Sequence, residues 1–165
     1  MTKNRIDTKL EQVKAAGKKA LIPFVTAGDG GYDLTEQIVL KLAENGADLI
    51  ELGVPFSDPI AEGPVIQRAS ERALSGGTTL AGIFELVKKL RKKLNDTPLL
   101  LMMYLNTIYR YGTERFFAQC KETGIDGVIV PDLPYEEKDE IQGTADAYGL
   151  SLIHISEPTR HLRIS

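Results

Sequence analysis

The sequence contains one cysteine, two histidines and no long apolar run. Because Cys120 has no second cysteine to pair with, an internal disulfide is excluded, and a reducing compartment fits this count best. The longest wholly apolar run, LLLMMYL at 99–105, is far too short to cross a bilayer, and the polar first residues lack the apolar core of a signal peptide. We therefore expect a cytoplasmic protein without a membrane partner.

The chain also lacks a strong excess of charge. Its formal net charge is −3, and we interpret its one basic run, KKLRKK at 88–93, as the solvated face of an amphipathic helix, so nucleic acid is not an expected partner. His154 and His161 both lie in the final stretch, which disfavours a His-rich metal site. No lysine falls at the end of a predicted strand, so Schiff-base chemistry is unsupported.

Apolar runs alternate with helical patterns along the chain. Runs that are nearly continuously apolar predict strands covered on both faces, and amphipathic spacing predicts the helices between them. This alternation predicts an all-parallel sheet built from right-handed βαβ units. The predicted strands are 20–26, 48–53, 99–105, 127–133 and 150–153, and the predicted helices are 6–16, 33–44, 64–74, 79–94, 113–122 and 135–147.

An internal repeat supports this organisation. ENGADLIEL at 44–52 and ETGIDGVIV at 122–130 share a helix end, a glycine, an aspartate and an apolar strand, so Gly46 and Gly124 are predicted to end helices at positive φ. Such units are typical of a (β/α)₈ barrel, although a doubly wound open sheet has the same local pattern. The segment TAGDGGYD does not match Gly-x-Gly-x-x-Gly, which disfavours a dinucleotide-binding fold. Five βα units account for about five-eighths of a barrel.

In either parallel fold, catalytic groups lie at the carboxyl ends of the strands. Each of the first four predicted strands delivers polar or aromatic side chains to that end, although the strand bodies are almost wholly apolar. A shared rim is therefore predicted. Its candidate residues are Phe24 and Thr26, then Glu51, Asp58 and Glu62, then Tyr104 and Asn106, and finally Asp132.

Glu51 is the most informative of these residues because it lies within the strand LIELG. If strand alternation turns it inward, its apolar neighbours raise the pKa of its carboxyl, which would make it an acid or base near neutral pH. A buried glutamate paired with an arginine or a backbone donor is an equally good interpretation. Taken alone, Asp58 reads as a turn residue before proline and Glu62 as an acid at a helix start. Tyr104 and Asp132 alone read as packing and turn residues.

Four segments of the chain closely resemble the tryptophan synthase α subunit family. They are PFVTAGD (23–29), IELGVPFSDPIAEGPVIQRA (50–69), LLMMYLN (100–106) and GVIVPDLP (127–134). The resemblance covers roughly residues 3–153, and it implies a TIM (β/α)₈ barrel fold, here an incomplete barrel of about five parallel strands with an extra N-terminal helix. Residues 1–153 would form the N-terminal part of a single barrel domain.

The resemblance also implies an activity, a lyase reaction in tryptophan biosynthesis. The family cleaves indole-3-glycerol phosphate to indole and glyceraldehyde 3-phosphate by a retro-aldol reaction. Glu51 matches the glutamate that protonates the indole ring carbon and assists proton transfer from the glycerol hydroxyl. Glu62 matches a position that is aspartate in many members, where the carboxylate binds the indole N–H, and Phe24 and Tyr104 would enclose the ring.

A partner follows from the same resemblance. Family members assemble with a β subunit as an α₂β₂ heterotetramer, and pyridoxal phosphate is expected only on the β subunit, so no cofactor is expected on this chain. Pro55, Asp58 and Asn106 match positions in loops that close the site and meet the β subunit.

After Ile153 the resemblance stops, and we predict that residues 154–165, HISEPTRHLRIS, form a tail without family pattern. No phosphate-binding residues can be assigned, so we expect little or no turnover from this chain, because the group that positions the substrate is missing. The alternative function is a non-catalytic fragment that only docks on the β subunit through the loop from Pro55 to Glu62. Another phosphosugar enzyme on the same fold is disfavoured by the length of the loop motif.

Overall fold

The computed structural model describes residues 4–58 and 62–153, which contain one parallel sheet. Its five strands lie in sequence order, and each pairs in parallel with the next, as the sequence predicts. The strands are β1 (Phe24–Thr26), β2 (Ile50–Gly53), β3 (Leu99–Met102), β4 (Gly127–Ile129) and β5 (Ser151–Ile153). Sequential order in a curved parallel sheet is the arrangement of a partial (β/α)₈ barrel.

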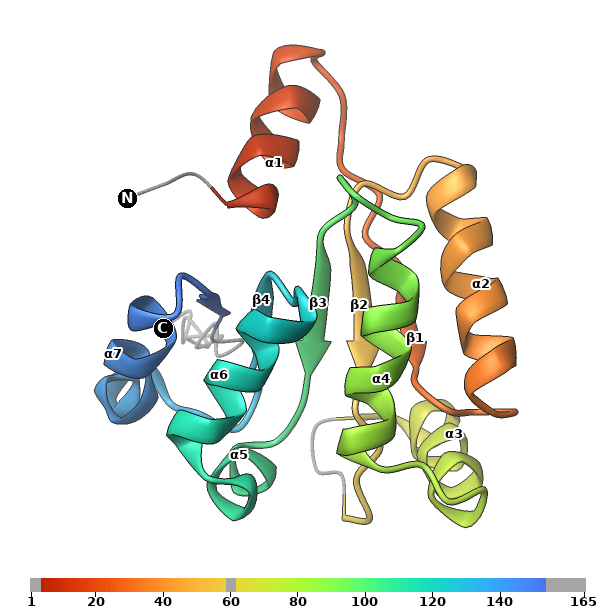
Figure 1. Ribbon diagram of the computed structural model, residues 1–165, viewed down its shortest axis with the longest axis vertical. Helices are drawn as coiled ribbons and strands as arrows, with labels where there is room; N and C mark the ends of the chain where they lie inside the picture. Colours follow the sequence, from red (N-terminus) through yellow and green to blue (C-terminus); the bar gives the residue numbers. More distant parts are fainter. Residues whose placement is uncertain (1–3, 59–61, 154–165) are drawn as a thin grey trace, which may run out of the picture.

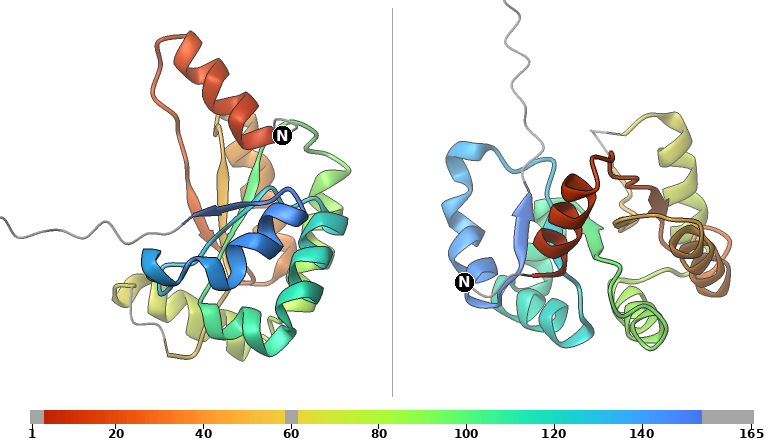
Figure 2. Two further views of the ribbon diagram at one scale, coloured as in Figure 1. Left: turned by 90° about the vertical axis from the view of Figure 1, so that its left-hand side faces the viewer. Right: turned by 90° about the horizontal axis from the view of Figure 1, so that it is seen from above.

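Helices surround the sheet in the positions that a barrel requires (Figures 1 and 2). Four helices line the outer face, namely α2 (Tyr32–Glu44), α4 (Leu80–Arg91), α6 (Thr113–Thr123) and α7 (Asp139–Ala147). Helix α1 (Arg5–Ala15) lies at the amino ends of the strands. Helices α3 (Pro64–Ser75) and α5 (Leu105–Tyr111) lie toward the carboxyl ends (Figure 1). The two ends of the sheet are therefore covered by different elements.

The two faces of the sheet pack into separate apolar clusters. Ile50 and Leu52 belong to the large cluster, which also contains the buried side chains of α2, α4 and α6. Leu49, Leu100 and Ile129 form a second cluster with Ile6 of α1. Because successive side chains of a strand point to opposite faces, the first cluster marks the outer face and the second marks the inner face of the partial barrel.

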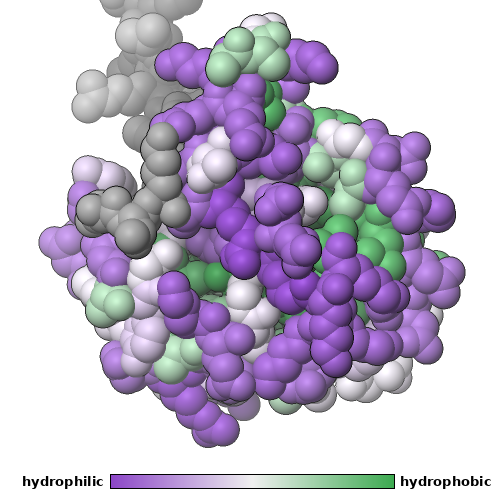
Figure 3. All heavy atoms as spheres, turned by 45° about the horizontal axis from the view of Figure 1, so that its top comes forward, coloured by the Kyte–Doolittle hydropathy of each residue, from purple (hydrophilic) through white to green (hydrophobic). Residues whose placement is uncertain are grey.

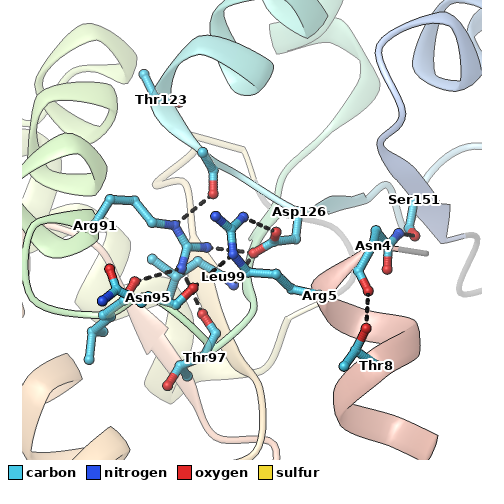
Figure 4. A network of polar contacts seen from close by, with 12 residues as sticks. Asn4, Arg5, Thr8, Arg91, Asn95, Thr97, Leu99, Thr123, Asp126 and Ser151 are labelled. Atoms are coloured by element: carbon cyan, nitrogen blue, oxygen red, sulfur yellow. Dashed lines mark hydrogen bonds and ion pairs between the residues drawn. The ribbon is translucent and has the colours of Figure 1, made fainter. Parts of the chain in front are cut away.

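A buried ion-pair network ties α1 and α4 to the amino ends of the strands (Figure 4). Asp126, which is 5% exposed, accepts hydrogen bonds from Arg5, from Arg91 and from the backbone N–H of Leu99. Arg91 also donates to the carbonyl oxygens of Leu94, Thr97 and Gly124. Burial lowers the pKa of the Arg91 guanidinium, and the charge of Asp126 opposes that shift. The network therefore stabilises the end of the sheet that lies opposite the predicted catalytic rim.

Several predicted boundaries are wrong, and one helix is missing from the prediction. The predicted strand 99–105 ends at Met102, and α5 begins at Leu105, where the backbone N–H donates to the carboxylate of Asp132 over 2.9 Å. The predicted strands 20–26 and 127–133 shrink to β1 and β4. The predicted helix 135–147 divides into a 3₁₀ turn (Tyr135–Glu137) and α7. Continuous apolar runs do not distinguish a strand from a short buried helix, which explains the first error.

Other local predictions are confirmed. Gly46 has φ 93° and Gly124 has φ 88°, so both glycines turn the chain at positive φ after a helix. The solvated face predicted for the basic run is confirmed for Lys88, Lys89 and Lys93, which are at least partly exposed and pair with carboxylates, but it is wrong for Arg91, whose mostly buried side chain joins the Asp126 network. Seen from the α1 end, the surface is mostly hydrophilic, with hydrophobic atoms showing in places (Figure 3).

The described residues contain neither a helix suited to cross a membrane nor a cluster of metal-binding side chains. Over residues 4–58 and 62–153, no helix combines the length and apolar character needed to cross a membrane. Within the same ranges, His, Cys, Asp and Glu side chains form no group of three that could hold a metal ion. His154 and His161, like the rest of the predicted tail, lie outside the described residues.

Candidate active site

Glu51 lies on the inner face of the sheet, on strand β2. Its neighbours Ile50 and Leu52 both pack in the outer cluster, so alternation turns the side chain of Glu51 to the opposite face. The register pairs Glu51 with Phe24 on one side and with Leu100 on the other. Paired residues of neighbouring strands share a face, so an aromatic ring and a leucine flank the carboxyl of Glu51.

This apolar setting alters the acidity of Glu51. Burial raises the pKa of its carboxyl above the ordinary value. Among the described residues, neither a hydrogen bond nor an ion pair reaches its side chain. The arginine partner or backbone donor that sequence reasoning left open is therefore absent from the described part of the chain. A carboxyl that holds its proton more tightly is better suited to donate a proton near neutral pH.

Glu62 meets Tyr104 at the carboxyl ends of β2 and β3. The hydroxyl of Tyr104 donates a hydrogen bond to the carboxylate of Glu62, and the side chain of Tyr104 is almost fully buried. The ring of Tyr104 stacks on Phe56, with ring centroids 4.9 Å apart. The Gln67 side-chain amide donates to the backbone oxygen of Glu62 over 2.9 Å. Both described ends of the β2–α3 loop are thus held by Tyr104, and α3 supports the Glu62 end.

The three predicted partner contacts lie on two elements, Pro55 and Asp58 in the β2–α3 loop and Asn106 on α5. Asp58 and Asn106 are exposed, whereas Pro55 is buried. Pro55 nevertheless lines a surface pocket of about 330 Å³ together with Phe56, Ser57, Leu74, Leu80, Thr107, Arg110 and Tyr111. The pocket therefore joins the loop to α5, which carries Asn106. Residues 59–61 of the predicted docking loop lie outside the described residues.

Two of the predicted rim residues have structural positions, and two residues near the rim are absent from the prediction. Asp132 accepts a hydrogen bond from the backbone at the start of α5, and Thr26 is buried at the end of β1, so both have structural positions. Phe56 and Gln67 were not singled out, although both stand inside the motif at 50–69. Phe56 could have been found from the sequence because it is an aromatic residue in a loop rich in glycine and proline. Gln67 could not, because its side chain contacts a backbone atom, which leaves no pattern in the sequence.

The fold and the rim together define an α/β-barrel protein with carboxylates and aromatic rings at the carboxyl ends of its strands. The family model described as tryptophan synthase alpha chain matches residues 10–164, and the chain belongs to this family. The match continues beyond Ile153 into the predicted non-family tail, whose boundary stays a prediction.

Individual relatives agree with the family assignment. The chain is 50% identical over 161 residues to the tryptophan synthase alpha chain of Thermoanaerobacter sp. (strain X514), covering 98% of this chain and 61% of the relative. A match to the same subunit from Citrifermentans bemidjiense shows 51% identity over 156 residues, covering 94% and 58% of the two chains. The chain thus spans about three-fifths of the length of the curated relatives it matches.

Solved structures show the same fold. The crystal structure of tryptophan synthase subunit alpha from Legionella pneumophila superposes with a TM-score of 0.89 at 47% identity, covering 92% of this chain and 58% of that one. A chain of the tryptophan synthase complex from Pyrococcus furiosus gives a TM-score of 0.78 at 42% identity, covering 82% and 55%. The TIM-barrel expectation is confirmed for the described part of the chain.

Proposed function

We propose that this chain carries the acid–base residues of a lyase that cleaves indole-3-glycerol phosphate to indole and glyceraldehyde 3-phosphate. Glu51 supports this proposal most directly, because its partly buried carboxyl lies between Phe24 and Leu100 on a barrel strand and has no ion-pair partner among residues 4–58 and 62–153. Membership of the tryptophan synthase alpha chain family supports indole-3-glycerol phosphate as the substrate. The Glu51 carboxyl group is the proton donor that the cleavage needs.

The proposed reaction begins with proton transfer from Glu51 to the ring carbon that carries the glycerol chain. The ring then has a positive charge at its N–H, and the carboxylate of Glu62 accepts a hydrogen bond from that group and stabilises the charge. A base removes the proton of the hydroxyl on the adjacent side-chain carbon, and the bond between this carbon and the ring breaks. Its electrons return to the ring, which leaves as neutral indole, and the side chain leaves as an aldehyde. Glu51, ionised after the first step, is the base that we assign.

Tyr104 has a defined part in this scheme. Its hydroxyl bonds to one oxygen of the Glu62 carboxylate, and a carboxylate has a second oxygen that can accept from a ring N–H. The side chain of Glu62, which is one methylene longer than the aspartate that the family resemblance implies, is thereby held in one place. Phe24 and Leu100 offer apolar contact to the ring. The proposed steps use no cofactor on this chain.

The proposed partner is a tryptophan synthase β subunit. The solved complexes from Pyrococcus furiosus, one of them described as α₂β₂, support it, and we assign the docking surface to the 330 Å³ pocket and its exposed neighbours Asp58 and Asn106. Docking without catalysis remains the alternative function, because this surface is separate from Glu51. We place the protein in the cytoplasm, as its single cysteine suggests.

Indole release from indole-3-glycerol phosphate, measured with and without added β subunit, tests the function. We expect slow release that E51Q abolishes, whereas E85Q, an exposed carboxylate on α4, behaves as the unchanged chain. Release by E51Q at the unchanged rate would refute the role of Glu51. Co-purification with the β subunit that persists in E51Q and is lost in D58A/N106A, without any indole release by the unchanged chain, would establish the docking alternative.

A further inference from the structure

Gly53, the last residue of β2, lies under the ring of Phe24. It is two residues beyond Glu51 and therefore on the same inner face of the sheet. A Cβ atom built at Gly53 would lie 2.3 Å from Cζ of Phe24, 2.7 Å from Cε2 and 3.4 Å from Cε1. Non-bonded carbon atoms approach to about 3.5–4.0 Å. The Phe24 ring therefore fills the space that any side chain at position 53 would need.

The backbone does not explain the glycine at this position. Gly53 is not among the glycines with positive φ, so an L-residue could adopt its conformation without strain. The atoms that an added Cβ would meet within 4 Å are led by the three ring atoms of Phe24. A side chain at position 53 would therefore displace the Phe24 ring from the place it now occupies.

The position of the ring matters for Glu51. Phe24 pairs in register with Glu51, but its ring extends over Gly53, which is about 6.6 Å further along β2 at about 3.3 Å per residue. The ring consequently lies on the side of Glu51 that faces the carboxyl ends of the strands. Water or a ligand that approaches Glu51 from that end meets the ring first.

We propose that Gly53 is a positioning residue of the site: the missing side chain keeps the Phe24 ring over the end of β2, where it limits water at Glu51 and forms one wall for a flat aromatic substrate. The statement about the aromatic substrate rests on the proposed function. The statement about water at Glu51 does not, since it concerns only residues of this chain.

A double-mutant cycle tests the contact. Leu lacks the Cε1, Cε2 and Cζ atoms of Phe24, so G53A should lower the urea midpoint of the chain, and most of that loss should disappear when G53A is made in F24L. G143A is the matched control, because a Cβ at Gly143 on α7 meets no atom within 4 Å. If G53A does not fold, folding of F24L/G53A still demonstrates the contact. A double variant that loses as much stability as the two single variants together would overturn it.

A carbon-13 NMR titration of the Glu51 carboxyl in the same chains tests the positioning. In G53A the displaced ring admits water, so the titration midpoint of Glu51 should move to lower pH, whereas G143A should leave it unchanged. In F24L, adding G53A should cause no further shift. A folded G53A chain with the midpoint of the unchanged chain would overturn the proposal. Neither measurement needs turnover, so a failure to cleave indole-3-glycerol phosphate would count against the proposed function alone.

Discussion

Replacing Asp126 by Asn should strongly destabilise the fold, although the two side chains have nearly the same shape. Asp126 is 5% exposed and neutralises Arg5 and Arg91 at once. The Arg91 side chain is only 11% exposed and stays charged when its partner becomes neutral. The amide NH₂ of asparagine would also turn a donor toward guanidinium donors, which cannot accept a hydrogen bond.

The magnitude follows from the partners that remain. Breaking a buried ion pair by removing one charge costs about 3–5 kcal/mol. Arg91 keeps its bonds to the carbonyls of Leu94, Thr97 and Gly124, so we expect a loss near the lower limit, about 3 kcal/mol. With a urea m-value of about 2 kcal/mol/M, the unfolding midpoint should fall by about 1.5 M.

Urea unfolding followed by circular dichroism at pH 7 measures this shift. E85Q provides the control, since it removes a carboxylate whose side chain is 72% exposed and pairs with Lys88 on the same helix. Its midpoint should stay at the unchanged value. A D126N midpoint that coincides with that of E85Q would show that the network contributes nothing to stability, and the reasoning from burial would fail.

Three further predictions concern the site and one helix end. Burial raises the pKa of Glu51, so the folded chain binds this proton more tightly than the unfolded chain. The free energy of unfolding should therefore fall as the pH rises from about 4.3, the ordinary pKa of Glu, through the pKa of the folded chain. E51Q should be more stable than the unchanged chain in urea at pH 7 but not at pH 4. Y104F loses the hydrogen bond to Glu62 and keeps the aromatic stack, so thermal unfolding should report a loss of about 1 kcal/mol. G124A places a Cβ at φ 88° and 3.1 Å from Cγ of Arg91, and calorimetry should report a loss of at least about 1–2 kcal/mol.

The part of the fold that can be predicted from sequence is the part that local physics determines. Gly46 and Gly124 mark helix ends because only glycine takes positive φ without strain, and both are found where the pattern placed them. The start of α5 could not be predicted in this way. It depends on the carboxylate of Asp132, 27 residues later in the sequence, which accepts from the backbone N–H of Leu105. A contact so distant in sequence leaves no local pattern.

The candidate site also has one feature that the sequence predicts and another that it does not. Glu51 could be placed on the inner face from strand alternation, because the side chain between Ile50 and Leu52 must point to the face opposite their side chains. The contact between Tyr104 and Glu62 joins two loops, and neither residue alone indicates the other. The contact of Tyr104 with a ligand ring, which the family resemblance implies, stays a prediction, and the contacts that the structure gives Tyr104 are the stack on Phe56 and the hydrogen bond to Glu62.

Two residues on the inner face of strand β2, Glu51 and Gly53, are unfavourable for the stability of the strand. Glu51 places a carboxyl among apolar neighbours with no ion-pair partner in the described part of the chain, and burial penalises its charge. Gly53 weakens a strand because it offers no side chain to pack, and its backbone does not require glycine. Ile50 and Leu52, on the other face, are fully buried in the large core and carry no such cost. Both unfavourable residues face the inside of the barrel and lie toward the carboxyl end, beside the ring of Phe24. A strand selected for folding alone would place Val or Ile at position 51, whereas a side chain at position 53 would meet the Phe24 ring, so the glycine follows from the ring and the acid from the proposed chemistry.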